Sequence, residues 1–167
     1  MSKRLNEPKP EFSRPIELAR IPKLGSHEKL SADAKECAAL AKRLIVPAIH
    51  SLTAELQAKP WRGGGLKVMG QLKADLDQES VVSLEVFRST VTYAVERYFL
   101  NVPPSADLES DEDIDPIKQG IVDLGEVVAE TLALELDPYP RKPGEAFTSV
   151  ETEDVLEEPK KPNPFNV

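Results

Sequence analysis

Two runs of alternating apolar and polar residues, on either side of a glycine-rich turn, constrain the fold of this chain most strongly. The run SLTAELQAK, residues 51–59, places leucine or alanine at every second position. After PWRGGG the alternation resumes in LKVMGQLKADLD, residues 66–77. A period of two is typical of a strand with one buried and one solvated face. The pattern therefore predicts a pair of antiparallel strands with one wet face.

Further strands are expected on both sides of this hairpin. Residues 11–21, EFSRPIELARI, alternate around Pro15 and are predicted as an edge strand, because proline cannot donate to a sheet ladder. Residues 81–87 and 91–102 are apolar on both faces in places and are predicted as two central strands joined at 88–90. The chain thus supplies four or more strands.

A first helix is predicted over residues 32–44, where ADAKECAALAKRL is rich in alanine and leucine. Ser31 is expected to be its N-cap, and Pro47 prevents its continuation. Its apolar stripe has helical spacing and consists of Ala34, Cys37, Ala38, Ala41 and Leu44.

A second helix is predicted to begin after Asp123, a suitable N-cap, and to end before Pro138. The side chains expected to bury against the sheet are Leu124, Val127, Val128, Thr131 and Leu132. Glu126 and Glu130 fall on the opposite face, where they are either solvated or available to a basic partner.

These elements predict an α+β domain, a meander of four or more antiparallel strands with two helices packed on one face. The domain is expected to span residues 11–144, between disordered tails at 1–10 and 145–167. Residues 103–117 contain six acids and three prolines and are expected to form a solvated acidic loop.

Charge is divided unequally along the chain. Residues 1–103 hold 16 Lys/Arg and 12 Asp/Glu, a net charge of +4, whereas residues 104–167 hold 5 and 17, a net charge of −12. Such asymmetry favours a polyelectrolyte partner. No run of about 18 apolar residues is present to span a membrane. Cys37 is the single cysteine, which excludes an intramolecular disulfide and favours a reducing cytoplasm.

One segment resembles a known protein family. Residues 123–140, DLGEVVAETLALELDPYP, resemble the C-terminal signature of the YceD family, the large ribosomal RNA subunit accumulation proteins (domain of unknown function 177). The positions that match are Asp123, Leu124, Val128, Glu130, Leu132, Leu134, Leu136 and Pro138. Residues 81–99 are similar to the paired strands of the family, and the resemblance covers roughly residues 12–144.

The resemblance implies a cytoplasmic, non-enzymatic factor that supports 23S ribosomal RNA accumulation or processing and hence large-subunit assembly. It implies 23S ribosomal RNA or its precursor as a partner and, through the genetic neighbourhood of the family, a small basic protein of the large subunit. Many members carry cysteines at positions that correspond here to Val86, Ser89 and Arg141 or Lys142. No metal, redox role or cofactor is therefore expected in this chain.

Two sets of side chains are candidates for binding. The candidate RNA contacts lie at the turn or on the wet face and are Lys59, Trp61, Arg62, Lys67, Lys73 and Arg88. Lysine and arginine bind phosphates, and an aromatic ring stacks on a base. The alternative is that these exposed lysines only maintain solubility. The alternative is supported because the sequence reveals no dense basic cluster and no aromatic pair. The candidate contacts for a basic partner are Asp111, Glu112, Asp113, Asp115, Glu126 and Glu130.

Catalytic chemistry has little support in the sequence. His27 and His50 lie in no recognisable constellation, and a zinc site that adds Cys37 lacks ligand spacing. Residues 63–65, three glycines, precede a strand rather than a helix and are expected to form a turn, not a phosphate-binding loop. A binding role is expected. The alternatives are a metal-dependent enzyme and a structural adaptor that dimerises through residues 12–18, both unrelated to ribosomes.

Overall fold

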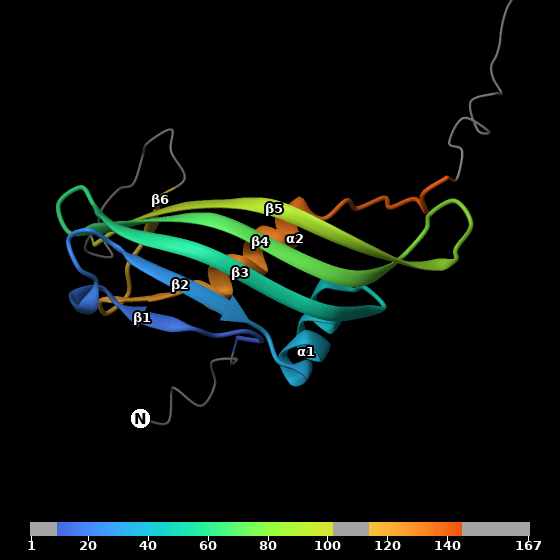
Figure 1. The fold of residues 1–167 in the computed structure, drawn as a ribbon, viewed down its shortest axis with the longest axis horizontal. Coiled ribbons are helices and arrows are strands. Elements are labelled where there is room, and N and C mark those ends of the chain that lie inside the picture. The colour runs from blue at the N-terminus through green and yellow to red at the C-terminus, as the bar shows by residue number, and fades with distance from the viewer. Residues whose placement is uncertain (1–9, 102–113, 145–167) are drawn as a thin grey trace, which may run out of the picture.

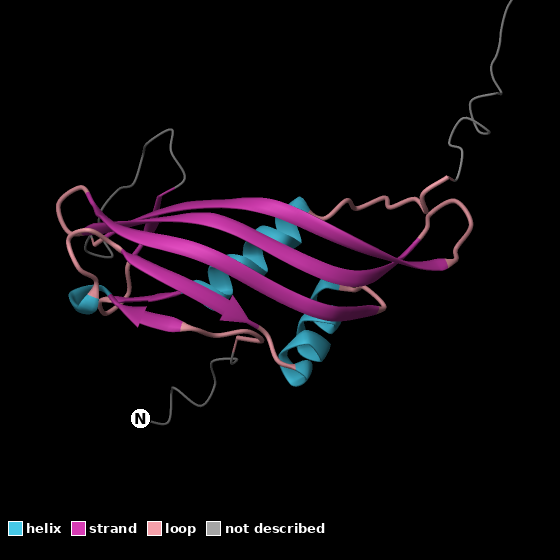
Figure 2. Ribbon diagram, viewed as in Figure 1, coloured by secondary structure: helices cyan, strands magenta, loops and turns pink. Residues whose placement is uncertain are grey.

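The computed structural model describes residues 10–101 and 114–144 of the 167 residues. The described residues form a five-stranded sheet of order β2-β3-β4-β5-β6, a two-stranded ribbon and two α-helices (Figure 1, Figure 2). The strands are β1 (Pro15–Glu17), β2 (Ser26–Ser31), β3 (Ala48–Trp61), β4 (Gly65–Glu79), β5 (Val86–Leu100), β6 (Ile114–Pro116) and β7 (Ile121–Asp123). The helices are α1 (Ala34–Leu44), α2 (Leu124–Glu135) and the short 3-10 helix η2 (Leu18–Arg20). The predicted α+β class is confirmed.

The predicted hairpin of alternating strands is confirmed as β3 and β4. The two strands are antiparallel neighbours, and their register pairs Lys59 with Lys67 and Trp61 with Gly65. The apolar positions of the alternation are buried, as expected: Leu52, Ala54, Leu56, Ala58, Leu66, Val68, Leu72, Ala74 and Leu76. β2 and β5 flank this hairpin in antiparallel pairing, so strands β2 to β5 form a meander.

The two strands predicted over residues 81–102 are one strand, β5, and the expected junction at 88–90 is wrong. β5 pairs with β4 along its length, from Val86 opposite Glu79 to Phe99 opposite Leu66. The polar residues at 88–90 therefore belong to a strand and not to a turn. The turn lies at residues 80–85, where the Ser80 hydroxyl accepts the amides of Val82 and Ser83.

Helix α1 begins later than predicted. Its N-cap is Asp33, which forms a capping box with Glu36, whereas Ser31 ends β2. Its buried side chains are Cys37, Leu40 and Ala41. Ala34 and Ala38, predicted on the buried stripe, are exposed, because the helix is rotated to bring Leu40 into the core.

Helix α2 follows the prediction closely. The Asp123 carboxylate accepts the amides of Gly125 and Glu126, which confirms this residue as the N-cap. The whole predicted stripe is buried. At the first turn of α2, a Cβ on Gly125 would lie 2.4 Å from the carbonyl oxygen of Phe12, so only glycine allows the N-terminal segment to cross here.

The N-terminal segment contributes less strand than expected. β1 contains only three residues and pairs with β7, not with the five-stranded sheet, while Phe12 is fully buried in the core. Pro15 stands at the first position of β1, where a proline is tolerated. In the view of Figure 1, α2 runs behind the sheet, and no helix of residues 10–101 and 114–144 covers the opposite face.

Candidate nucleic-acid interface

The uncovered face of the sheet is built from the polar positions of the strands. The register places Lys59, Lys67 and Tyr98 side by side on β3, β4 and β5. Trp61 lies two residues beyond Lys59 and therefore on the same face. Four side chains from three strands thus meet at the end of the sheet that carries the β3–β4 turn.

Aromatic and cationic groups are in contact at this end. The ring centroids of Trp61 and Tyr98 lie 4.8 Å apart with an interplanar angle of 51°. The guanidinium carbon of Arg62 lies 4.4 Å from the Trp61 ring centroid, and Lys67 Nζ lies 5.7 Å from the Tyr98 centroid. We call Lys59, Trp61, Arg62, Lys67 and Tyr98 the basic-aromatic cluster. It contains the aromatic pair that the sequence did not reveal.

A tight turn positions the cluster. Residues 62–64 all have positive φ, with values of 30° at Arg62, 24° at Gly63 and 89° at Gly64. Glycine adopts such angles without steric cost. The amide of Gly65 then donates to the carbonyl of Arg62 at 2.7 Å, which returns the chain beside β3 and sets the register of the lysines.

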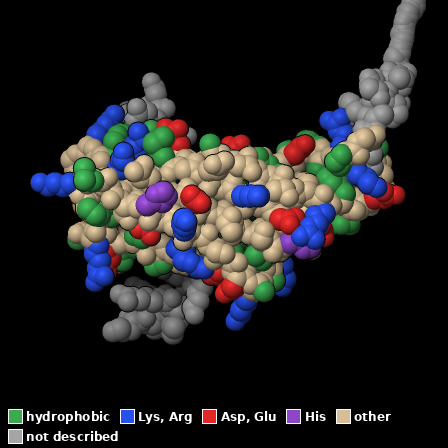
Figure 3. Space-filling model, in the orientation of Figure 1, with side chains coloured by type: hydrophobic (Ala, Val, Ile, Leu, Met, Phe, Trp, Pro, Cys, Tyr) green, Lys and Arg blue, Asp and Glu red, His purple; other side chains and the backbone are tan. Residues whose placement is uncertain are grey.

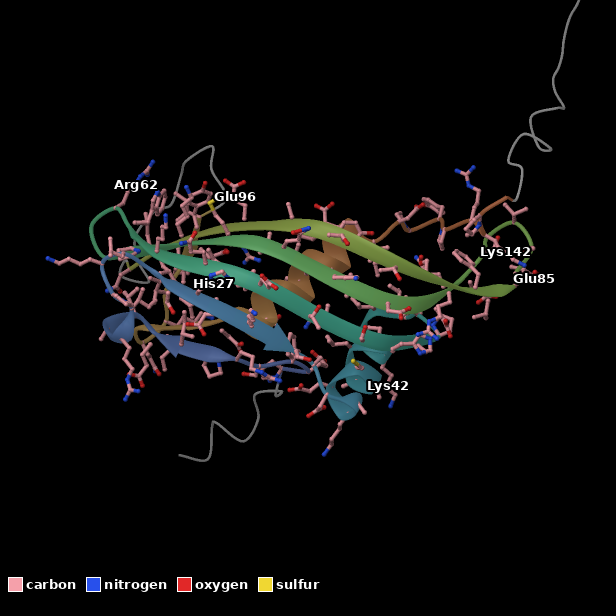
Figure 4. All side chains as sticks on the ribbon, viewed as in Figure 1. His27, Lys42, Arg62, Glu85, Glu96 and Lys142 are labelled. Atoms are coloured by element: carbon pink, nitrogen blue, oxygen red, sulfur yellow. The ribbon has the colours of Figure 1, made fainter. Side chains whose placement is uncertain are left out.

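The face is hollowed beyond the cluster. A trough with a volume of about 1060 Å³ crosses the middle of the sheet, and its lining includes Lys29, Glu55, Gln71 and Lys73. His27 also lines it; it is labelled in Figure 4, and Figure 3 views the same face with its basic side chains. The trough and the basic-aromatic cluster form one continuous surface, because Lys67 and Lys73 lie on the same face of β4.

Positive charge predominates between the turn and the trough. The cationic side chains there are Lys29, Lys59, Arg62, Lys67 and Lys73, and the carboxylates are Glu55 and Glu96. Glu96 accepts a hydrogen bond from the Tyr98 hydroxyl. No salt bridge between described residues involves Lys59, Lys67 or Lys73. Their charge is available to an anionic ligand.

Arg88, the sixth candidate RNA contact, lies apart from the others. It is close to the start of β5, and its guanidinium donates to both carboxylate oxygens of Asp75 at 2.9 and 2.7 Å. The hydrogen bond from Arg88 lowers the pKa of Asp75, so both groups are charged and neutralise each other. The structure therefore brings together four of the six candidates, places Lys73 in the trough and separates Arg88. Tyr98 is the member that the sequence analysis missed, because only the register of β4 and β5 brings it to Trp61.

The candidate acids on α2 are partly exposed, at 31% for Glu126 and 39% for Glu130, and each pairs with an arginine of the same chain. Glu126 accepts two hydrogen bonds from Arg43 of α1, at 3.2 and 3.1 Å. Glu130 accepts from Arg97 of β5 at 3.0 Å. Each carboxylate lies at the edge of the buried stripe, within reach of an arginine of a neighbouring element. Asp115 of β6 also binds Arg97, at 2.5 Å, whereas Asp111, Glu112 and Asp113 lie outside the described residues.

The described residues contain no group of three or more histidine, cysteine, aspartate or glutamate side chains that could hold a metal ion. His50 Nε2 lies 2.9 Å from Asp77 Oδ1, and Cys37 is buried, which raises the pKa of its thiol. The helices described here are all too short or too polar to cross a membrane.

A sheet with helices on one face and a basic-aromatic surface on the other places the chain in the class of α+β domains. Residues 68–167 match the family model described as large ribosomal RNA subunit accumulation protein YceD. This match covers more than half of the chain, and the chain belongs to the YceD family. Comparison with curated proteins and with solved structures gave no match. Lys73 and Tyr98 lie within the matched residues, whereas Lys59 to Lys67 precede them. Of the residues that carry the resemblance, Leu124, Val128 and Leu132 are buried in the core.

Proposed function

We propose that this protein is a cytoplasmic, non-enzymatic factor that supports accumulation of the large-subunit ribosomal RNA by binding 23S ribosomal RNA or its precursor. The observation that carries the proposal is the contact between Trp61 and Tyr98 beside Lys59, Arg62 and Lys67. The family description names ribosomal RNA and no reaction, which supports a binding role.

The chemistry of the cluster suits single-stranded RNA. Aromatic side chains bind unstacked bases, and each stacked base contributes about 1–3 kcal/mol. Lysines alongside the rings neutralise backbone phosphates and release counterions. The trough continues from the cluster with Lys73 and Lys29, so the strand would run from the β3–β4 turn across the middle of the sheet.

The ion pairs favour RNA over a basic protein as the ligand of this surface. Glu126, Glu130 and Asp115, three of the candidate contacts for a basic partner, each bind an arginine of the same chain. Opening one of these pairs would leave a part-buried arginine without its carboxylate, which opposes binding. The lysines of the open face have no such competing partner among the described residues.

The test measures binding of a fluorescein-labelled single-stranded fragment of 23S ribosomal RNA by anisotropy across a salt series. Replacing both Lys59 and Lys67 by alanine should weaken binding and reduce the slope of log K against log salt by about 1.4, because each phosphate contact to single-stranded RNA contributes about 0.7. Trp61→Leu should weaken binding by about tenfold or more, with little change in the slope.

Arg88→Ala provides the matched control, since Arg88 is an exposed cation of the same sheet that is already neutralised by Asp75. It should leave affinity and salt slope close to those of the native protein. Loss of binding in Arg88→Ala equal to that in the double lysine variant, or absence of RNA binding by the native protein, would contradict the proposal.

A further inference from the structure

A second surface lies at the opposite end of the sheet from the basic-aromatic cluster. There the C-terminal ends of α1 and α2 meet the β4–β5 turn and enclose a groove of about 540 Å³. Figure 4 labels Glu85 and Lys142 at this end and Arg62 and Glu96 at the other. We call it the distal groove; its lining residues include Ile45, Glu79, Val81, Leu84, Leu136 and Asp137.

Large apolar side chains in the distal groove are open to solvent. Ile45 is 89% exposed, Leu84 is 69% exposed and Val81 is 49% exposed. Single exposed apolar residues are ordinary on protein surfaces, but these three line one concavity, together with three prolines. Exposed apolar side chains that share one concavity make it a candidate contact surface for a partner.

The backbone at two of these residues is unfavourable for the side chains that they carry. Ile45 has φ of 57° and Leu84 has φ of 63°, in the left-handed region that glycine or asparagine normally occupies. Both turns are held by backbone hydrogen bonds, from Ile45 to the carbonyl of Lys42 and from Leu84 to that of Ser80. Glycine would preserve those bonds. Because the two side chains are exposed, they add little to the core, and the fold alone does not account for them.

The groove also has a preferred charge. Its described lining contains two carboxylates, Glu79 and Asp137, and no lysine or arginine. Lys142, nearby, is already engaged with Glu85 at 2.9 Å. An apolar concavity with carboxylates in its wall is complementary to apolar side chains that are accompanied by positive charge.

From these observations we propose that the distal groove binds an extended, cationic segment of another protein, in which bulky aliphatic or aromatic side chains alternate with lysine or arginine. The apolar side chains would occupy the groove against Ile45, Val81 and Leu84, and the cations would face Glu79 and Asp137. The surface is separate from the proposed RNA site, since β4 and β5 each contain 15 residues and extend about 50 Å between the two ends.

The probe is a fluorescein-labelled synthetic peptide in which leucine alternates with lysine, and its control carries glutamate in place of lysine. The full-length protein should bind the lysine peptide and not the glutamate peptide, with an affinity that falls as salt is added. The double variant Ile45→Gly with Leu84→Gly should lose about tenfold or more in affinity for the lysine peptide. Its melting temperature should be equal to or higher than that of the native protein, because the strained backbone is relieved.

Leu24→Gly is the matched control, since Leu24 is also 89% exposed. Leu24 lies at the other end of the sheet, because its neighbour Gly25 packs next to Lys59. This control should leave peptide binding unchanged, and neither variant should alter RNA binding. Equal binding of both peptides would overturn the proposal, and so would an unchanged peptide affinity in the double glycine variant. A third contradicting result would come from light scattering, if the native protein had the mass of two chains and the double glycine variant the mass of one. The last would identify a second copy as the occupant.

Discussion

Arg97 connects three elements that are far apart in the sequence. From β5 its guanidinium donates to Asp115 of β6 and to Glu130 of α2. Burial by itself would lower the pKa of Arg97, but the hydrogen bonds to the two carboxylates outweigh burial and the pKa is raised. Arg97 therefore remains positively charged, and its ion pairs hold both β6 and α2 next to β5.

Arg97→Ala should lower the free energy of unfolding by about 1–3 kcal/mol, because it leaves two carboxylates beside each other without their cation. The figure is below that for a fully buried pair, since Asp115 and Glu130 are 42% and 39% exposed. Glu130→Ala should also destabilise, by less, since Asp115 remains bonded to Arg97. Urea denaturation gives both values. Arg88→Ala, which removes an exposed pair, should leave stability close to that of the native protein. An equal loss in the two arginine variants would argue against the linking role.

At the scale of elements, the sequence predicted the strands and the helix whose apolar and polar residues alternate with one buried and one solvated face. The alternation in β3 and β4 and the stripe of α2 required no knowledge of neighbouring elements. β2, β6 and β7 were missed, because strands of three to six residues are too short to show a period. The polar run at 88–90 has the composition of a turn, but its register with β4, in which Arg88 lies opposite Asp77 and Thr90 opposite Asp75, makes it part of a strand.

For the candidate site, too, the sequence predicted the residues that a local pattern reveals and not the contacts that depend on other elements. The wet face of the hairpin gave Lys59, Trp61 and Lys67 from their positions in the alternation. The contact of Trp61 with Tyr98 depends on the register between β4 and β5, and that register is fixed by packing along the whole strand. The ion pairs of Glu126 and Glu130 likewise depend on where α2 lies relative to Arg43 and Arg97, which no local pattern specifies.

Gly125→Ala tests the contact between α2 and the N-terminal segment. In a helix this change ordinarily stabilises by about 1 kcal/mol. Here the new Cβ would lie 2.4 Å from the carbonyl oxygen of Phe12 and 3.0 Å from the amide nitrogen of Arg14, both backbone atoms that cannot rotate away. We expect a loss of about 1–3 kcal/mol by thermal or urea unfolding. Ala133→Gly, at an exposed position of the same helix, is the control and should cost about 1 kcal/mol. A rise in the melting temperature of Gly125→Ala would show that the crossing is loose.

For the whole molecule, the dominant property is the separation of charge. The sheet presents the lysines of β2, β3 and β4 on its open face, whereas residues 104–167 carry a net charge of −12. Negative charge attached to the same chain lowers the encounter rate with RNA and does so most strongly at low salt. The C-terminal third therefore has an electrostatic effect on the proposed RNA site, whatever contacts it makes.

Removal of residues 145–167, which hold six acids and two lysines, should increase the association rate with RNA at low salt. The increase should disappear as the Debye length shortens to about 3 Å near 1 M salt. Stopped-flow fluorescence with the labelled fragment measures the rate. A variant in which the same residues are replaced by a neutral glycine-serine sequence of equal length should behave like the truncation. An increase that persists at high salt would point to steric rather than electrostatic obstruction.

The buried position of Cys37, which is the single cysteine of the chain, has a practical consequence. Only the thiolate reacts with maleimides, and burial both shields this sulfur and disfavours its ionisation. A cysteine introduced at Gln71, on the floor of the trough, would thus accept a fluorophore selectively without prior removal of the native thiol. The dye would then report directly on whatever enters the trough.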